Sequence, residues 1–296
     1  MLWIYYPILF IFGLGIGSFL NVVIWRYKPG RSIFDIKPLK GRSHCPYCKK
    51  KLKWFELIPL ISFFAQGGRC RSCKHKLSVQ YPIVEFLSGA IFVGVQYFLI
   101  NFYNLESTLA DKTLLFILFA LWVLVFLTWL LISVIDWRHY LIPNGLNVML
   151  VTLGLFIVVI KNQIAISITP FHGSFLRHYT LIFSPTQDIW INHIIGALVG
   201  ALFFVLIILV SRGRAMGWGD VKFALASGFV IAWPEVALSL ILAFVLGGLF
   251  GAVLLITNKK TMKDKLPFAP FLTVSIVITI FFGYYLIQNY LGLFGM

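Results

Sequence analysis

The sequence has little charge and very little acid. Only 12% of its 296 residues are Asp, Glu, Lys or Arg, and only ten are acidic. Soluble domains carry about 25% charged and about 45–50% apolar residues, whereas 60% of this chain is hydrophobic. The shortage of charge excludes an ordinary soluble enzyme, and the apolar content excludes a disordered chain. The composition predicts an all-α protein that crosses a membrane several times.

Two further features are missing. No basic stretch precedes the first apolar segment, so we expect that segment to stay as a membrane helix and not to be removed as a signal peptide. No predicted strand leads into a glycine-rich nucleotide loop. Gly13, Gly15 and Gly17 form a GxGxG string, but they lie in an apolar segment. Helix packing is therefore their expected role, and cofactor binding there is the less favoured alternative.

About eight segments are apolar enough to be transmembrane helices. A span needs about 20 apolar residues, and the fourth and sixth candidates fall short of that length. A turn is expected at Trp233-Pro234, and the sixth candidate could be a tilted or partly buried helix. The candidates are 3–24, 82–100, 114–135, 146–160, 189–210, 221–232, 236–256 and 268–290. GxxxG pairs, which favour helix contacts, occur at Gly196/Gly200 and Gly247/Gly251.

The basic residues are concentrated in one stretch. Between Arg26 and Lys76 there are 14 Lys or Arg residues and two acids, Asp35 and Glu56. A nucleic-acid patch is one interpretation. In a chain with many spans, a cytoplasmic loop that follows the positive-inside rule is the better one, so we expect no nucleic-acid partner.

The remaining charges support one orientation. With the N-terminus outside, the loops on the cytoplasmic side hold 22 of the 25 Lys and Arg residues, and the outer segments 101–113 and 161–188 hold three. We expect 161–188 to be an irregular outer loop. The chain then divides into a first helix over 1–24, a basic cytoplasmic domain over 25–81, and a seven-helix membrane domain over 82–296.

Four cysteines in the basic stretch form two CxxC pairs separated by 21 residues. Each CxxC turn can direct two thiolates at one point, and two such turns complete a tetrahedral site. The neighbouring cations favour thiolates, and the expected compartment is reducing. We predict a structural, non-catalytic zinc ion, with disulfides or redox chemistry as the alternative. His44 or His75 could replace a cysteine as ligand. The four cysteines are Cys45, Cys48, Cys70 and Cys73.

Two aspartates at span ends are candidates for catalysis. Asp136 ends the third span and Asp220 begins the sixth, so both are expected at one membrane face, where acids are costly and often functional. Helix capping, or ion pairs with Arg138 and Lys222, is the structural alternative. Two adjacent carboxyls can share a proton, activate water and polarise a peptide carbonyl. Such a pair would have the chemistry that peptide hydrolysis needs.

Around Asp220 the sequence is Gly217-Trp218-Gly219-Asp220, a GxGD motif whose glycines allow a substrate chain to approach closely. Other motifs follow along the chain. They are GSFLNVVI at 17–24, SHCPYC at 43–48, IPLIS at 58–62, GRCRSC at 68–73, LSVQYPIVE at 77–85, LIPN at 141–144 and PFAPF at 267–271. In this order they resemble the type IV prepilin peptidases, a family of GxGD intramembrane aspartic proteases.

The resemblance implies a bacterial inner-membrane enzyme that removes the leader of prepilins or pseudopilins at the cytoplasmic face. Cleavage follows a Gly, usually before Phe. Members with the cysteine loop commonly methylate the new N-terminal amine with S-adenosylmethionine. Asp136 and Asp220 carry over as the catalytic pair, with Gly217, Gly219 and Lys222 shaping the site. Trp218 and Ala269 occupy less strict positions of the motifs, and the segment 161–188 is longer than expected.

The sequence itself does not locate a methylation site. Asn21 and Glu85, near the ends of the first two spans, are the polar groups that could hold an amine or a cofactor, although structural helix-end roles are equally consistent with them. Two alternatives stay open. One is a peptidase without methyl transfer, and the other is an ion-binding transporter or scaffold. Besides its polypeptide substrate, membrane lipid is the expected partner, with anionic lipid contact as a role for the basic loop.

Overall fold

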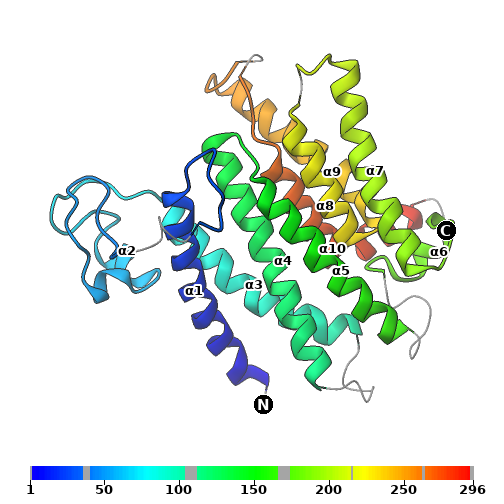
Figure 1. Ribbon diagram of the computed structural model, residues 1–296, viewed down its shortest axis with the longest axis horizontal. Coiled ribbons are helices and arrows are strands. Elements are labelled where there is room, and N and C mark those ends of the chain that lie inside the picture. The colour runs from blue at the N-terminus through cyan, green and yellow to red at the C-terminus, as the bar shows by residue number, and fades with distance from the viewer. Residues whose placement is uncertain are drawn as a thin grey trace. The chain divides into compact units, whose positions relative to one another are not determined.

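The computed structural model of the chain describes residues 2–35, 41–103, 112–165, 174–214, 216–261 and 264–293 (Figure 1). Within these ranges the regular structure is helical and no strand occurs, which confirms the all-α prediction. The helices are α1 (Leu2–Arg26), η2 (Trp54–Leu57), α2 (Ile61–Ala65), α3 (Gln80–Tyr103), α4 (Lys112–His139), α5 (Asn144–Ala165), η3 (Arg177–Tyr179), α6 (Thr180–Phe183), α7 (Ile189–Val210), α8 (Trp218–Ile231), α9 (Glu235–Ile256) and α10 (Ala269–Gly292).

Seven of the described helices are long and apolar enough to cross a membrane: α1, α3, α4, α5, α7, α9 and α10. The eighth predicted span corresponds to α8, which has 14 residues. At 1.5 Å per residue α8 is about 21 Å long, less than the roughly 30 Å thickness of a bilayer core. The protein is therefore a multi-pass membrane protein in which one helix is short.

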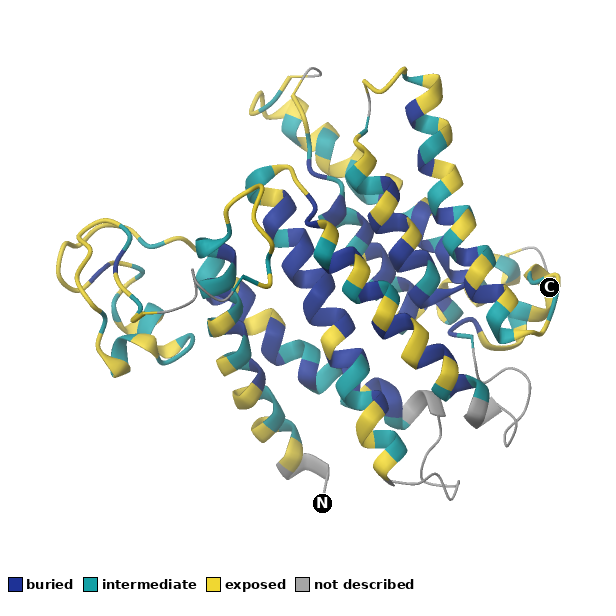
Figure 2. Cartoon of the chain, viewed as in Figure 1, coloured by how far each residue is buried: buried dark blue, intermediate teal, exposed yellow. Residues whose placement is uncertain are grey.

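Helix α8 is short but deeply packed. It contacts α7 and α5 in the second of the two compact units described below, and eight of its residues are buried (Figure 2). The α7–α8 contact depends on the first GxxxG pair. A Cβ atom on Gly196 would lie 2.5 Å from the Gly228 carbonyl oxygen, and one on Gly200 would lie 2.6 Å from the Ala224 carbonyl oxygen. These glycines therefore allow the two backbones to touch.

The second GxxxG pair packs differently. Cβ atoms on Gly247 and Gly251 would meet only side chains, Phe271 at 3.6 Å and Leu266 at 3.5 Å. These are ordinary van der Waals distances, so this pair does not mark a close approach of two helix backbones.

The chain forms two compact units, residues 1–99 and 100–296. In the first unit, α1 packs closely on α3. Cβ atoms on Gly13 and Gly17 would lie 2.8 Å from Gly89 Cα and 2.7 Å from Glu85 Cα. The GxGxG string is therefore a helix-packing surface, as expected, while Gly15 has open space around it. The predicted three-part division at residues 24/25 and 81/82 stays a prediction.

The second unit is a helical bundle whose core lies between α4, α5, α8 and α10 (Figure 2). The ends of its helices fall into two groups. The C-terminus of α4 and the N-termini of α5, α8 and α10 lie at one end of the bundle, joined by the hydrogen bonds described below. The N-termini of α7 and α9 lie at the other end, where Trp233 N–H donates to the Asn192 carbonyl at 3.0 Å.

Two local predictions can be compared with the structure. The turn expected at Trp233-Pro234 separates α8 from α9, and its peptide bond is cis. The outer segment expected to begin at residue 161 begins later, because α5 continues to Ala165 and Lys161 is buried in the bundle. Residues 174–183 also contain the short helices η3 and α6, whereas 166–173 lie outside the described residues.

Candidate active site

Asp136 lies in the last turn of α4 and is almost fully buried, with 5% of its surface exposed. Its carboxylate Oδ2 accepts a hydrogen bond from the backbone N–H of Ala269 at 3.2 Å. Ala269 is the first residue of α10, so the positive end of that helix dipole is directed at the carboxylate. The segment that contains Ala269 thus contributes a backbone donor, which the sequence motif alone did not indicate.

Asp220 lies in the first turn of α8 and is half-buried. Its Oδ2 accepts a hydrogen bond from the Gly217 N–H at 3.3 Å, so the motif folds back on itself. A Cβ atom on Gly219 would lie 3.6 Å from Ile142, which shows that α8 begins beside the segment that follows Asp136. A negative group at this position is also stabilised by the α8 dipole.

The two aspartates are brought together in the same unit. Their carboxyl groups are close enough to interact electrostatically, although they are 84 positions apart. Lys222 does not serve as the ion-pair partner considered above; its Nζ donates to Asn144 Oδ1 at 3.1 Å. That bond joins the start of α8 to the start of α5. The starts of α8 and α10 therefore each supply a backbone N–H to one carboxyl of the pair, and α5 begins beside α8.

Such a pair has a specific chemical capability. Two carboxyls close to each other cannot both ionise cheaply, so one holds a proton while the other is an anion. The backbone donors and helix N-termini stabilise the anion without neutralising it by a fixed cation. An acid and a base side by side at a membrane-helix end suit the addition of water to a peptide carbonyl.

The four predicted cysteines form one cluster in the first unit. Their sulfur atoms all lie within 4.8 Å of one another, and the Sγ atoms of Cys45 and Cys73 are 3.9 Å apart. A tetrahedral ion with metal–sulfur bonds of about 2.3 Å places its sulfur ligands about 3.8 Å apart. Cys45 and Cys70 are buried, while Cys48 and Cys73 are exposed. The donor set fits a closed four-thiolate metal site.

The two CxxC turns have the same local structure. Cys45 N–H donates to the Lys50 carbonyl at 3.0 Å, and Cys70 N–H donates to the His75 carbonyl at 2.9 Å. The residue after each second cysteine, Lys49 or Lys74, has a positive φ of about 60°. Backbone hydrogen bonds from Cys73 and then Ser72 lower the pKa of Cys70 to about 7, which favours the thiolate. The two CxxC turns therefore share one backbone geometry and lie on either side of the cluster.

Asn21 and Glu85, the methylation candidates, line one cavity of about 270 Å³ in the first unit. Asn21 Nδ2 donates to the Tyr81 carbonyl at 3.1 Å, while its buried Oδ1 has no hydrogen-bond partner among the described residues. Glu85 Oε2 accepts from Leu60 N–H at 2.8 Å. The rings of Trp25 and Tyr81 stack at the same cavity, 5.6 Å apart with planes 7° from parallel.

Leu60 is held in an unusual conformation. Its φ is 60°, a region that side chains other than glycine rarely adopt, and Ile61 N–H donates back to the Pro59 carbonyl at 2.6 Å. The Glu85 carboxylate holds this tight turn in place through the Leu60 N–H. Glu85 therefore has a structural role, positioning the segment 58–62, in addition to facing the cavity.

A second buried polar cluster lies at the opposite end of the bundle from the aspartates. Glu235 and Lys161 are both nearly fully buried, with 1% and 2% of their surfaces exposed, and their charges interact. Glu235 Oε1 accepts from Ser174 Oγ and from Phe175 N–H, the latter at 2.8 Å. The Lys161 ammonium lies 4.7 Å from the centre of the Phe175 ring. Lys161 falls in the segment 161–188 that was expected to be an irregular outer loop, so its burial was not expected.

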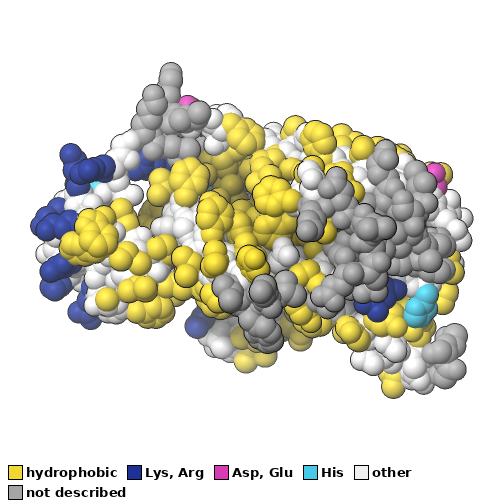
Figure 3. Space-filling model, turned by 90° about the horizontal axis from the view of Figure 1, so that it is seen from below, with side chains coloured by type: hydrophobic (Ala, Val, Ile, Leu, Met, Phe, Trp, Pro, Cys, Tyr) yellow, Lys and Arg dark blue, Asp and Glu magenta, His cyan; other side chains and the backbone are white. Residues whose placement is uncertain are grey.

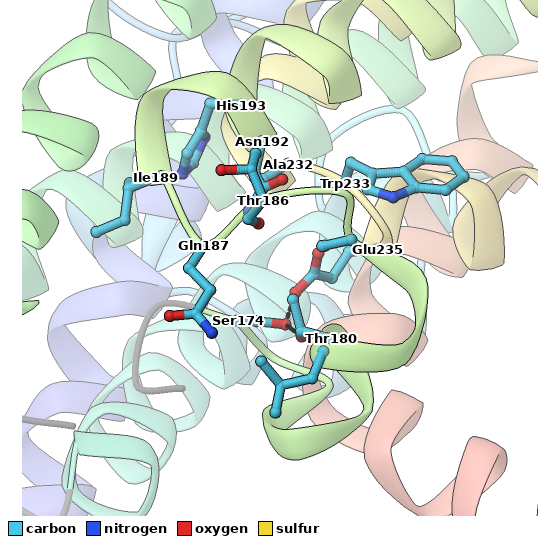
Figure 4. Close-up of a pocket in the computed structure, with 12 residues that line it drawn as sticks. Ser174, Thr180, Thr186, Gln187, Ile189, Asn192, His193, Ala232, Trp233 and Glu235 are labelled. Carbon is cyan, nitrogen blue, oxygen red and sulfur yellow. Dashed lines mark hydrogen bonds between the residues drawn. The ribbon is translucent and has the colours of Figure 1, made fainter. Parts of the chain in front are cut away.

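A small cavity of about 50 Å³ adjoins this cluster (Figure 4). Ser174, Thr180 and Glu235 lie on one side of it, with Asn192 and His193 of α7 on another (Figure 4). The ring nitrogen Nδ1 of His193 donates to the Phe229 carbonyl at 2.6 Å, which attaches α7 to α8. The Glu235 hydrogen bonds and the contact of Lys161 with Phe175 tie the segment 174–183 to the end of α5 and the start of α9. The structural role of the cluster is to hold the segment 174–183 against this end of the bundle through buried polar contacts.

Comparison with known proteins gives a consistent picture. Residues 11–99 match the Bacterial Peptidase A24 N-terminal domain, and residues 123–252 match the Type IV leader peptidase family. The chain is 30% identical to a Bacillus subtilis protein, covering 96% of this chain and 97% of the relative. It is 27% identical to a Legionella pneumophila protein, covering 98% and 96%, and 28% identical to an Aeromonas hydrophila protein, covering 95% and 92%. All three relatives are named prepilin leader peptidase/N-methyltransferase. No solved structure matches the chain.

Proposed function

The chain belongs to the type IV leader peptidase family, and we propose that it cleaves the leader peptide of type IV prepilins or pseudopilins and methylates the new N-terminal amine. The observation that carries the proposal is the convergence of Asp136 and Asp220, which lie at the ends of α4 and α8 and interact electrostatically. Prepilins and pseudopilins are the polypeptide partners, and surrounding lipid is the second partner.

In the cleavage step the ionised carboxyl of the pair takes a proton from a water molecule. The water oxygen forms a bond to the carbonyl carbon of the residue before the cut, expected to be Gly. The protonated carboxyl donates its proton to the carbonyl oxygen. When the C–N bond breaks, the leaving amine takes the proton that the pair removed from water. The gem-diol returns a proton to the other carboxyl as the carboxylic acid product forms, which restores the pair. Because the two carboxyls titrate as one unit, the pair and not either residue is the catalyst.

The backbone around the pair has supporting roles. Ala269 N–H and Gly217 N–H each hold one carboxylate oxygen, which leaves the other oxygens of Asp136 and Asp220 to face substrate and water. Lys222 positions the start of α8 through Asn144. We place this site at the cytoplasmic face of a bacterial inner membrane, since the loops at that end of the predicted topology hold 22 of the 25 basic residues.

The expected cofactors have separate places in the first unit. Cys45, Cys48, Cys70 and Cys73 would hold a zinc ion that stabilises the loop and, having four protein ligands, takes no part in chemistry. S-adenosylmethionine, which supplies the methyl group when bound, would occupy the cavity lined by Asn21 and Glu85. The unpartnered Asn21 Oδ1 and the stacked Trp25–Tyr81 pair offer an acceptor and an aromatic face to such a ligand. Glu85 would hold the amine that is to be methylated.

Cleavage is tested by co-expression of the full chain with a prepilin that has a Gly-Phe junction. Asp136→Asn and Asp220→Asn should each slow leader removal by about 100- to 10,000-fold, the usual contribution of a general acid or base. Asp188→Asn is the matched control, because Asp188 caps α7 through Ile191 N–H and Asn caps equally well. Normal processing by either of the first two variants would disprove the assignment.

Methylation is tested on the same product by mass spectrometry of its N-terminus. In Glu85→Gln the amide oxygen can still accept from Leu60 N–H, so the turn at 58–62 keeps its support while the negative charge is lost. We expect cleaved but unmethylated product, with cleavage in the same sample as the internal control for folding. Normal methylation would remove Glu85 from consideration. If the wild-type protein yields product that is cleaved but never methylated, the protein is a peptidase without methyltransferase activity.

A further inference from the structure

The loop that carries the cysteines exposes large apolar side chains beside a dense set of cations. Trp54 and Leu57 of η2 and Ile61 and Phe64 of α2 are 78%, 40%, 66% and 71% exposed. The two short helices η2 and α2 are close in sequence and in contact, so these four exposed side chains belong to one part of the loop. We name Trp54, Leu57, Ile61 and Phe64 the aromatic patch. The packing of the core of this unit does not explain why Trp54 and Phe64 are exposed.

The cations around the aromatic patch are all exposed as well. Eight Lys and Arg residues fall between positions 49 and 76, where the only acid is Glu56. Glu56 is already occupied, since its Oε2 accepts from Lys53 N–H at 2.8 Å. The Lys53 and Arg71 side chains both lie over the Phe55 ring, at 5.8 and 5.3 Å from its centre, next to Trp54. Figure 3 shows Lys and Arg side chains beside hydrophobic ones on the surface. The eight are Lys49, Lys50, Lys51, Lys53, Arg69, Arg71, Lys74 and Lys76.

The residues of helix α2 divide into those that line the cavity and those that are exposed to solvent. Leu57, Ser62 and Phe63 line the cavity, and Phe63 packs on Gly68, while Ile61 and Phe64 are exposed and do not line it. The outward pair is therefore not needed to build the cavity. The bond from Leu60 N–H to Glu85 fixes the start of α2 on α3, so the outward face is presented by a held element.

We propose that the aromatic patch and the eight cations dock this loop on the surface of an anionic membrane leaflet. The loop runs between α1 and α3, which both have the length and hydropathy of spans, so it is tethered beside the bilayer surface. Aromatic side chains are favoured at the headgroup level, and each cation near an anionic surface adds attraction. Eight cations with a single acid attract an anionic partner and repel a cationic one, and an anionic leaflet supplies such a surface beside the tethered loop. The proposal goes beyond the peptidase and methyltransferase assignments and does not depend on them.

Hydrogen exchange of the full-length protein tests the proposal without any substrate. The protein is reconstituted in nanodiscs of phosphatidylcholine alone or of phosphatidylcholine with phosphatidylglycerol. We expect backbone amides of 54–64 to exchange roughly tenfold more slowly in the anionic discs. Raising NaCl to about 0.5 M, where the Debye length falls to about 4 Å, should remove most of this protection.

Variants separate docking from folding. Trp54→Ser/Phe64→Ser should lose the lipid-dependent protection at 54–64 while the amides of the two CxxC turns keep theirs. Tyr47→Ser is the matched control, because Tyr47 is a 55% exposed aromatic that stacks on His75 outside the patch. Equal exchange in the two lipids would overturn the proposal. Protection that instead requires an added prepilin peptide, whatever the lipid charge, would overturn it too and assign the patch to substrate.

Discussion

At the residue scale, the carboxyl pair depends on backbone geometry more than on side-chain partners. Asp136 and Asp220 stand out as candidates in the sequence, because acids are rare in this chain and both stand at span ends beside recognisable motifs. The donor from Ala269 was not predictable, since it depends on where α10 begins relative to α4, 133 positions away. Sequence motifs identify reactive side chains more readily than they identify the backbone groups that hold them.

The buried pair Lys161 and Glu235 shows the opposite case. Glu235 directly precedes the predicted span 236–256, whereas nothing near Lys161 in the sequence indicated burial. Lys161 is buried because Phe175, from a segment with no periodic pattern, covers it and because Glu235 offsets its charge. A charge in a loop and a charge at a helix end look alike until the tertiary structure brings their partners together.

This pair yields a prediction about stability. Glu235→Gln leaves the Lys161 ammonium buried without its counter-charge, and breaking one side of a buried pair costs about 3–5 kcal/mol. We expect the variant to unfold at clearly lower temperature in detergent. The double variant Lys161→Met/Glu235→Gln removes both charges and should recover much of the loss. Additive effects of the two substitutions would contradict the coupling, and leader cleavage measured below the unfolding temperature serves as the control for the distant active site.

At the element scale, α8 determines how the second unit is built. Hydropathy predicted a short and partly buried helix here, which is what the structure has. The close contact with α7 was also predictable in kind, because Gly196 and Gly200 are spaced one turn apart. The partner surface on α8 was not, since Ala224 and Gly228 form no motif of their own. The sequence thus identified the face of α7 but not the helix that covers it.

A prediction follows for the α7–α8 contact. In Gly196→Ala the new methyl group would lie 2.5 Å from the Gly228 carbonyl oxygen, so the helices must separate. Overpacking of this kind costs about 1–3 kcal/mol. Because α8 carries Asp220, leader cleavage should fall together with the unfolding temperature. Gly248→Ala in α9 is the matched control, because a Cβ atom there meets nothing within 4 Å. Equal stability of the two variants would contradict the role of Gly196.

At the scale of the whole molecule, the sequence predicted the spans well. Membrane helices must satisfy their own backbone and be apolar over about 20 residues, so their signal is local. The cavity of the first unit was not predictable, because its lining comes from positions 18 to 85 and depends on the turn at Leu60. The sequence singled out two polar residues of this region, Asn21 and Glu85. The structure shows that both line the same cavity.

The two CxxC pairs of the sequence form one cluster of cysteines in the structure, and the zinc content of this cluster can be measured. Four sulfur atoms within 4.8 Å of one another, with one pair at 3.9 Å, match a tetrahedral site. We expect one zinc per chain by elemental analysis of the purified protein, and none in Cys45→Ser/Cys70→Ser. Without the ion, a loop with so small a core should lose its compact structure, so trypsin should cut it much faster than in wild type.

Two histidine variants complete that experiment. His44→Ala and His75→Ala should each retain the zinc, because the cysteine sulfurs already supply four ligands and His44 Nδ1 lies by the Arg42 carbonyl, at 3.3 Å. Loss of zinc in either variant would show that a histidine replaces one of the exposed cysteines as ligand. Retention of a full zinc in Cys45→Ser/Cys70→Ser would contradict the site altogether. Since Cys45 and Cys70 are the two buried members, their removal tests the centre of the cluster and not its edge.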